Sequence, residues 1–395
     1  MRPAIATAAV QQSGTRPQVV VISSVLPRPT SAGEIILHRH LSGLADWTVQ
    51  VSPPPHEAIP LSTPVKLLKR LERTRFHRWG HDLEAMANGL IWSTSTSSAI
   101  LLDSPTVVLT VAHGDGCWAA QRFARRYQLP LVTIFHDWWP DIPAVHAPIR
   151  ALLANRFQQL YRRSALALCV SEGMQQQLGS HPNSQVLYPI PAEGTQQVSG
   201  KTSLPVGPNQ SFRVIYLGNL YDYGPMLGDL LQAVKHHPRV QVQVRGANPS
   251  WPGGFQEEMR KRGLWLDFAP RSELEDWLAS ADAFLVTMSF DPALRRRMET
   301  SFSSKLTEYA QFGKPIIIWG PEYCSAIKWG LDGDRAVCIT SNSPQTLVNA
   351  LKRLSQDFYQ QEYYASQAQI AARQEYNPVN LQQHFLEAIS KFVSI

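Results

Sequence analysis

The chain has 395 residues, of which 44% are hydrophobic and 17% charged, with a formal net charge of +6 and a pI of about 9.1. This length is long for one core and predicts two domains. The composition lies in the globular range. The basic excess fits an anionic partner, namely a nucleotide, an acidic lipid surface or a nucleic acid.

The cysteines, the apolar runs and the first residues of the chain narrow the class of protein further. The four cysteines are widely spaced and form no C-x-x-C pair, which argues against a zinc site or a redox pair. Their low number suits a reducing compartment, so we expect a cytoplasmic protein. No uninterrupted apolar run reaches the roughly 18 residues of a membrane span. Residues 1–16 carry only a short Ala-rich run and are interpreted as a disordered leader.

Residues 17–192 are predicted to form a first Rossmann-like domain. The run 18–23 is nearly all apolar, which is typical of a central parallel strand. A loop ending at Gly33 and a helix over 34–44 follow, which is the first unit of a nucleotide-binding half. A plain connector is the alternative for this loop, because such glycine loops are weak motifs.

The segment 65–79 is strongly basic and amphipathic, with leucines and Phe76 able to share one helix face. Basic amphipathic helices can lie on anionic membranes. The alternative is an ordinary exposed helix with a solvated basic face. The segment therefore leaves two interpretations open, a solvated helix and a peripheral contact with the inner face of a membrane.

A polar cluster follows the apolar strand predicted at 131–135. It begins with His136 and Asp137, just past the carboxyl end of the strand, where α/β folds place ligands. A histidine there can titrate or form hydrogen bonds near neutral pH. The alternative is a structural His–Asp pair that caps the strand.

The second half repeats the pattern of the first. Residues 193–211 are rich in Gly, Ser, Thr, Pro and Gln and are predicted to be a linker. A second Rossmann-like domain is predicted over 212–376, beginning with a strand that ends at Gly218 and Asn219. A clean alternation over 240–245 predicts a strand that carries Arg245 to its end.

The stretch 300–315 concentrates the signals of a ligand-binding helix. Ser303 or Ser304 can cap a helix whose buried face includes Leu306, and a glycine and a proline then end it. Free N–H groups beside Lys305 favour an anion, most simply a phosphate. Glu308 lies one turn further on the side of Ser304. An ordinary helix-to-strand crossover with a solvated Glu308 is the alternative.

This stretch resembles the donor-site segment of GT-B type glycosyltransferases, especially family 4, with the signature Ser-Lys-Leu-x-Glu-Tyr-x-x-x-Gly-Lys-Pro. The matching residues are Ser304, Lys305, Leu306, Glu308, Tyr309, Gly313, Lys314 and Pro315. The resemblance implies an α/β protein of GT-B architecture, with two Rossmann-like doubly wound domains facing a central cleft. The first domain would dock the acceptor, the second would bind a nucleotide-diphosphate sugar, and a last helix over 377–395 would cross back to the first domain.

The resemblance also implies roles for residues. The catalytic residues would be His136, Lys305 and Glu308, with Glu308 on the ribose of the donor and His136 near the transferred sugar. The donor-binding residues would be Gly33, Gly218, Asn219, Arg245, Ser303, Ser304, Lys305, Leu306 and Glu308. The family implies retention of anomeric configuration and transfer without a metal, so we expect no cofactor and no metal site.

The sequence departs from the family pattern at three points. The first loop has a single glycine where the family usually has two. Asn219 and Tyr223 stand where family 4 usually has an Arg and a Lys. Either Arg245, Arg271 or the run 295–297 replaces them, or activity is reduced. The first glutamate of the family's Glu-x7-Glu pair falls on Thr300, with Glu299 adjacent.

The sequence therefore predicts a glycosyltransferase that moves a sugar to a saccharide or lipid-linked acceptor. One alternative is a nucleotide-sugar epimerase of similar fold. A second is a non-catalytic partner that binds sugar nucleotides, which the missing Arg and Lys favour. A nucleic-acid binder is not expected, because no stacked-aromatic or helix-turn-helix pattern appears.

Overall fold

The computed structural model of the chain describes residues 16–30, 32–52, 70, 73–87, 100, 102, 104–192, 211–218, 220–247 and 249–393. Several predictions concern residues outside these ranges: the leader up to residue 15, most of the linker at 193–210, Asn219, and all but Arg70 of the stretch 65–72.

In the described residues, the first domain contains a six-stranded sheet with the order β2-β1-β3-β4-β5-β6, and all neighbours are parallel. Its strands are β1 (Gln18–Ile22), β2 (Thr48–Ser52), β3 (Thr106–Val111), β4 (Leu131–Phe135), β5 (Leu166–Cys169) and β6 (Ser184–Val186). Its helices are α1 (Ala32–Ser42), α4 (His77–Ala87), α6 (Gly116–Tyr127), α7 (Ala147–Arg163) and α8 (Glu172–Leu178), with a 3-10 turn η1 (Trp139–Asp141). The order changes direction between β1 and β3, which makes their carboxyl ends the switch point of the sheet.

The second domain repeats this plan, again counting only described residues, with a parallel six-stranded sheet of order β12-β11-β10-β7-β8-β9. Its strands are β7 (Phe212–Leu217), β8 (Val240–Arg245), β9 (Trp265–Leu266), β10 (Ala283–Thr287), β11 (Ile316–Trp319) and β12 (Val337–Ile339). Its helices are α9 (Gly224–Val234), α10 (Gly253–Lys261), α11 (Arg271–Ala279), α12 (Arg295–Thr300), α13 (Ser304–Ala310), α14 (Ser325–Leu331), α15 (Pro344–Gln356) and α16 (Phe358–Arg373), with a 3-10 turn η2 (Pro292–Leu294). The switch point lies between β7 and β10.

Helices cover both faces of each sheet, which explains why the central strands are apolar runs rather than alternating ones. In the first domain, α6 and α7 bury Phe123 and Phe157 against one face. The other face packs against Leu37 of α1 and Phe385 of α17 (Pro378–Ser390). In the second domain, α9 and α15 cover one face and α13, α14 and α16 the other. The predicted pair of doubly wound α/β domains is confirmed.

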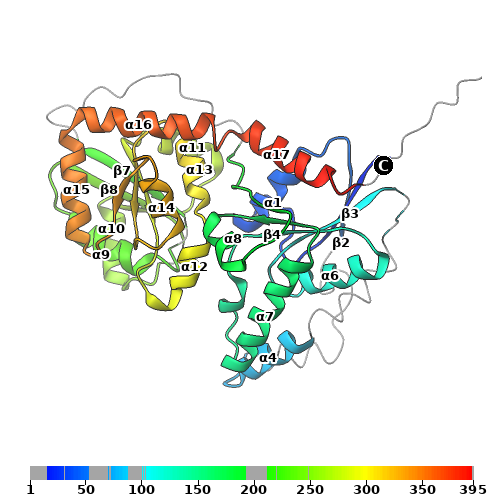
Figure 1. Cartoon of the computed structure of the whole chain (residues 1–395). Helices are drawn as coiled ribbons and strands as arrows, with labels where there is room; N and C mark the ends of the chain where they lie inside the picture. Colours follow the sequence, from blue (N-terminus) through cyan, green and yellow to red (C-terminus); the bar gives the residue numbers. More distant parts are fainter. Residues whose placement is uncertain are drawn as a thin grey trace, which may run out of the picture.

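The two domains meet through α8 and α12, which lie between the sheets (Figure 1). A Cβ atom on Gly173 of α8 would lie 2.0 Å from the Glu299 carbonyl oxygen, so only glycine permits this approach. The Ser171 hydroxyl caps α8 by accepting from the Met174 N–H and also donates to the Thr300 carbonyl at 2.5 Å. The same serine therefore begins a helix in one domain and binds the other domain.

Helix α17 adds a second connection between the domains. It follows Tyr376 of the second domain and runs along α1 of the first (Figure 1). The Asn377 side chain caps it by accepting from the Val379 and Asn380 N–H groups. Phe385 is fully buried against the first sheet, and Gln382 donates to the His40 carbonyl at 2.9 Å.

Candidate functional site

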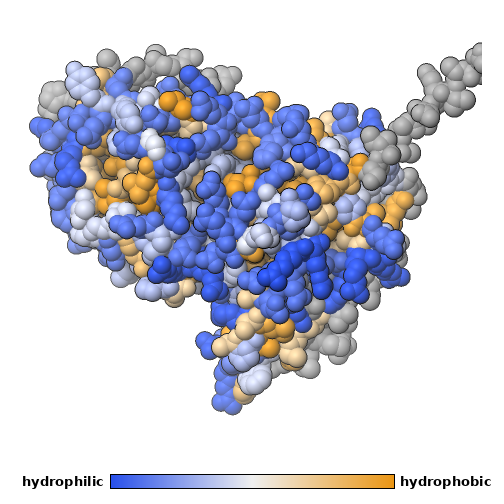
Figure 2. All heavy atoms as spheres, in the orientation of Figure 1, coloured by the Kyte–Doolittle hydropathy of each residue, from blue (hydrophilic) through white to orange (hydrophobic). Residues whose placement is uncertain are grey.

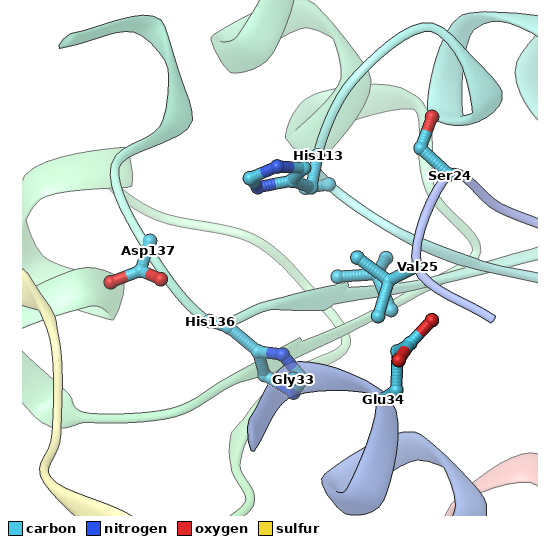
Figure 3. A pocket seen from close by; sticks show the side chains of 9 residues that line it. Ser24, Val25, Gly33, Glu34, His113, His136 and Asp137 are labelled. Carbon is cyan, nitrogen blue, oxygen red and sulfur yellow. The ribbon is translucent and has the colours of Figure 1, made fainter. Parts of the chain in front are cut away.

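A hollow of about 310 Å³ opens at the carboxyl ends of β1, β3 and β4, at the switch point of the first sheet. Its lining residues are Ser24, Val25, Gly33, Glu34, Val111, Ala112, His113, His136 and Asp137. Figure 3 shows that these residues come from four separate segments, 24–25, 33–34, 111–113 and 136–137, which surround the hollow. The structure thus brings two predicted site residues, Gly33 and His136, to one pocket.

Close backbone packing builds one wall of this pocket. The loop after β3 presses onto the loop after β1, and a Cβ atom on Gly116 would lie 2.3 Å from the Ser24 backbone nitrogen. Gly114 adopts a φ of 64° and passes just as close to the Ser24 side chain, whose hydroxyl oxygen accepts from the Gly116 N–H at 2.9 Å. The glycines that permit this approach therefore come after β3, whereas sequence reasoning looked for them in the first loop.

The two histidines of the pocket are neutral. Burial lowers the pKa of His136 to about 4, with His113 adding to the shift and Asp137 opposing it. Burial also lowers the pKa of His113, against the opposing charge of Asp137. A neutral imidazole offers one donor and one acceptor, which suits sugar hydroxyls. Sequence reasoning missed His113, although it follows the mostly apolar run 107–112 just as His136 follows the run 131–135.

Asp137 connects the pocket to the second domain. Its carboxylate points away from the hollow (Figure 3) and accepts a hydrogen bond from the Ser301 hydroxyl at 2.6 Å. Arg297 of α12 lies 3.7 Å from the same carboxylate and 3.3 Å from Asp222, which follows β7. Arg297 thus bridges the carboxyl end of β4 and the carboxyl end of β7.

The second-domain half of the site centres on Lys305. Its ammonium nitrogen lies 5.1 Å from the ring centre of Tyr216 and 5.8 Å from that of Tyr223. Gly218, with a φ of 144°, leaves room for it, since a Cβ atom there would lie 2.5 Å from Lys305 Cε. Burial lowers the pKa of Lys305 to about 8, and the charge of Asp222 opposes the shift. The structure therefore brings Lys305 and Gly218 together at the switch point of the second sheet.

The carboxylate of Glu308, expected to bind a ribose, is engaged by the first domain. Arg39 of α1 forms an ion pair with it at 2.5 Å, and the Ala192 N–H donates to its other oxygen at 3.1 Å. Its side chain nevertheless stays 28% exposed. Sequence reasoning did not single out Arg39, because it stands 269 residues from Glu308 in the chain.

The other predicted donor-site residues take varied places. Ser303 is the N-cap residue of α13, but its side chain makes no cap hydrogen bond, and Ser304 is the first helical residue. Leu306 is fully buried in the core, so its side chain serves packing and not ligand binding. Arg245 stacks over Trp277 at 4.9 Å from the ring centre.

Among the cations considered as replacements for the missing Arg and Lys, Arg297 is the one that bridges carboxylates of both switch points. Arg295 pairs with Glu299 on its own helix, and Arg296 pairs with Asp141. The side chain of Arg271 lies outside the described part of the structure. Glu299, considered as the family's first glutamate, is thus occupied by Arg295.

Comparisons with known proteins agree with this fold. Residues 52–189 match the model of Glycosyltransferase Family 4. Among solved structures, HepE of Anabaena in complex with UDP-glucose has 16% identity, a TM-score of 0.61, and coverage of 95% of this chain and 99% of that one. Sucrose-phosphate synthase of Thermosynechococcus elongatus has 11% identity, a TM-score of 0.65 and coverage of 95% and 99%. WaaG, a glycosyltransferase involved in lipopolysaccharide biosynthesis, has 12% identity, a TM-score of 0.58 and coverage of 96% and 100%.

The chain has the fold of GT-B glycosyltransferases. A search among curated protein sequences gave no match. The family 4 model matches the first domain of this GT-B chain, whereas the motif that suggested the family lies in the second domain, at 300–315. Two separate parts of the chain therefore point to the same family, which confirms the predicted resemblance.

The described residues were expected to hold neither a membrane-spanning helix nor a metal site. None of the described helices of this GT-B chain combines the length and apolar character needed to cross a bilayer. Within the same residues, no group of three or more His, Cys, Asp or Glu side chains is arranged to hold a metal ion. Transfer without a metal stays a prediction of the family resemblance.

Proposed function

We propose that the chain transfers a sugar from a nucleotide-diphosphate sugar to a saccharide or lipid-linked acceptor, with retention of configuration and without a metal. The observation that carries the proposal is the pair of switch points joined by Arg297. One holds a pocket with two neutral histidines, and the other holds the buried ammonium of Lys305. Hydroxyl-binding groups and a cation thus belong to one connected site.

The chemistry needs positive charge where the sugar–phosphate bond breaks, because negative charge builds on the departing diphosphate. Lys305 supplies it, since a pKa of about 8 leaves most of its ammonium protonated at neutral pH. Arg297 is the second cation in reach of this region and replaces the family's usual Arg. His136 and His113 orient the reacting sugar through hydrogen bonds, and Glu308 binds the ribose.

The donor is proposed from the neighbours. HepE was solved with UDP-glucose, with UDP, and with UDP and glucose, which supports a UDP-sugar as the first donor to test. The acceptor is proposed to enter the first domain, through the pocket that holds His136. The proposed donor site also includes Gly33 and Gly218, where the backbone can approach the donor closely, and Asn219, which follows Gly218 in the sequence.

We also propose that the chain works at the inner face of a membrane. Three apolar side chains of α4 follow helical spacing and stay exposed: Trp79 at 60%, Leu83 at 49% and Met86 at 55%. Arg73, Arg75 and Arg78 are exposed beside them. Aromatic and apolar residues flanked by arginines suit an anionic lipid surface. This surface includes Arg73, Arg75, Arg78 and Trp79 of the predicted segment 65–79 and extends it along α4 to Met86.

The position of α4 supports the same proposal. Asp82 of α4 accepts from the His146 N–H at 3.0 Å and from His146 Nδ1 at 2.6 Å, at the first turn of α7. Helix α7 begins at the edge of the sheet where β4 ends, which is also the edge of the pocket. Hydrophobic residues gather on this tip of the first domain (Figure 2). A lipid-linked acceptor would therefore meet the protein on the side of the pocket.

The proposal is tested by incubating the protein with UDP-glucose and other sugar nucleotides, a panel of saccharide and lipid-linked acceptors, and EDTA. We expect a transfer product, and a rate lowered about 100-fold or more by Lys305→Met, because one lost charge-stabilising group typically costs that much. The matched control is Lys261→Met, which removes an exposed lysine of α10 paired with Glu257. Its rate should equal that of the wild type.

Two other outcomes would favour the alternatives. An epimerised sugar nucleotide formed from the donor alone would identify an epimerase and contradict the transferase. Tight binding of a sugar nucleotide without turnover across the acceptor panel would identify a non-catalytic partner protein.

A further inference from the structure

We infer that Arg39 is a positioning residue for the donor site, and that it holds the Glu308 carboxylate in the orientation that receives the ribose. The inference rests on the proposed function. Arg39 lies on α1 of the first domain, which is predicted to dock the acceptor, and no part of the family signature at 304–315 includes it.

The contacts of Arg39 join three segments of the chain. One nitrogen of its guanidinium, Nη1, lies 2.5 Å from Glu308 Oε1 and donates to the Ile190 carbonyl at 2.8 Å. The Ala192 N–H donates to Glu308 Oε2 at 3.1 Å. The carboxylate is thus held on one side by α1 and on the other by the chain that leaves the first domain. A bond to an ionised partner is roughly twice as strong as a neutral one.

These contacts leave Glu308 able to bind a ligand. An ionised carboxylate has about four lone-pair sites, and the contacts with Arg39 and Ala192 use one on each oxygen. The side chain remains 28% exposed, so ribose hydroxyls can reach the unused positions. Arg39 therefore does not block the site but fixes the orientation of its acceptor groups.

Fixing this side chain before the donor arrives should improve donor binding. Immobilising a flexible side chain on binding costs about 0.5–1.5 kcal/mol, which corresponds to a 2- to 10-fold change in affinity. Because Arg39 and Ala192 already order the Glu308 side chain in the folded protein, this free-energy cost does not reduce the affinity for the donor. Glu308 also sits one turn after Lys305 on α13, so the same anchoring keeps the ribose position in register with the diphosphate position.

The position of α1 gives the contact a further consequence. Gly33 and Glu34, at the start of α1, line the pocket, and Arg39 lies further along the same helix. His40, the next residue, is buried against Phe385 of α17 with ring centres 5.0 Å apart. A single rigid helix therefore carries both a wall of the pocket and the anchor of the donor-site carboxylate.

The test compares Arg39→Met, Arg39→Lys, Glu308→Gln and the double variant Arg39→Met/Glu308→Gln, using the KM for UDP-glucose and kcat at saturating acceptor. We expect Arg39→Met to raise the donor KM about 2- to 10-fold with little change in kcat, and Arg39→Lys to recover part of the loss. The double variant should show the KM of Glu308→Gln alone, because Arg39 acts through Glu308. The matched control is Arg262→Met, which breaks the one-turn ion pair between Arg262 and Glu258.

The outcomes separate this inference from the proposed function. If the wild type neither binds nor turns over any sugar nucleotide, the proposed function fails. If the wild type is active and Arg39→Met matches Arg262→Met in donor KM, only the role of Arg39 is overturned. If the effects of Arg39→Met and Glu308→Gln simply multiply in the double variant, Arg39 acts on general structure and the inference is equally overturned, whatever the melting temperatures.

Discussion

Lys305 is the residue whose charge matters most to the proposed reaction, and its surroundings oppose that charge. Burial lowers the pKa of its ammonium to about 8, while Asp222 acts in the opposite direction. The unfolded chain would hold the same proton up to the ordinary lysine pKa near 10.5. Below pH of about 8 the folded protein therefore carries a buried charge that disfavours folding, and stability rises with pH between about 8 and 10.5.

This shift predicts a pH dependence of donor binding. The ammonium attracts the diphosphate only while protonated, so the affinity for UDP-glucose should be constant below pH of about 8 and fall roughly tenfold by a pH one unit above it. Calorimetric titrations from pH 6.5 to 9.5 measure this directly. Lys305→Met should bind weakly with no such fall, yet melt at a higher temperature at pH 7 because the buried charge is gone. A wild-type affinity that stays level up to pH 9.5 would contradict the assignment.

The residues of the site differ in how well sequence patterns predicted them. Lys305 and Gly218 were found because a motif and a strand end mark them, and the structure packs one against the other. His113 follows the mostly apolar run 107–112 but belongs to no motif. The role of Arg39 could not be predicted, because its partners Ile190 and Glu308 stand 151 and 269 residues away in the chain. Sequence patterns report local structure, and a contact between distant segments leaves no local pattern.

Elements with strong periodicity or clear caps were predicted closely. The helix expected at 34–44 is α1 (Ala32–Ser42), and the strand expected at 131–135 is β4 (Leu131–Phe135). The alternation that predicted β8 matches its burial, with Val240, Val242 and Val244 inside and their neighbours half-buried. Helix α12 was not predicted, because its run of three arginines has no apolar period, and contacts with the other domain place it.

Helix α4 is expected to bind anionic membranes through its exposed apolar stripe, Trp79, Leu83 and Met86. Its exposed stripe should hold the protein on anionic vesicles, because each buried apolar side chain of this size contributes about 1.5–3 kcal/mol and each nearby arginine about 1 kcal/mol. Replacing Trp79 and Leu83 by serine should lower co-sedimentation with phosphatidylglycerol vesicles at least tenfold. Arg75→Gln with Arg78→Gln should weaken binding mainly at low salt.

A matched surface in the other domain provides the control. Tyr359 and Ile370 on α16 are exposed at 86% and 45%, so replacing both by serine removes comparable apolar surface from a helix without the arginines of α4. Vesicle binding should not change. Equal losses from both pairs of substitutions, or equal binding to neutral phosphatidylcholine vesicles, would show that α4 is an ordinary solvated helix, which was the competing interpretation from the sequence.

At the scale of the whole molecule, the approach of the two domains depends on a few close contacts. The Ser301–Asp137 hydrogen bond, the Arg297 bridge and the α8–α12 contact all connect the carboxyl ends of one sheet to the second domain. The apolar patterns of the sequence predicted both sheets, since each core is largely built within its own half. The sequence could not predict how the halves dock, because polar contacts of this kind have no periodic signature.

The docking can be tested at Gly173, where a Cβ atom would lie 2.0 Å from the Glu299 carbonyl oxygen. Gly173 is the second residue of α8, where alanine would normally favour the helix. Any loss of stability in Gly173→Ala must therefore arise at the domain contact, where overpacking costs about 1–3 kcal/mol. We expect turnover to fall several-fold, because the pocket and Lys305 belong to different domains. UDP affinity should fall by no more than it does in Arg39→Met, because Arg39 is the first-domain residue proposed to support donor binding.

Gly254 gives the comparison that isolates this effect. It is likewise the second residue of its helix, α10, and a Cβ atom there would meet nothing within 4 Å. Gly254→Ala should leave turnover unchanged and stability equal or slightly higher, by up to about 1 kcal/mol. Steady-state kinetics and UDP titrations on the two variants then separate domain docking from helix propensity. Wild-type turnover in Gly173→Ala would mean that the domains need not approach through α8 and α12 to react. A loss of UDP affinity larger than that of Arg39→Met would mean that the damage extends into the second domain itself.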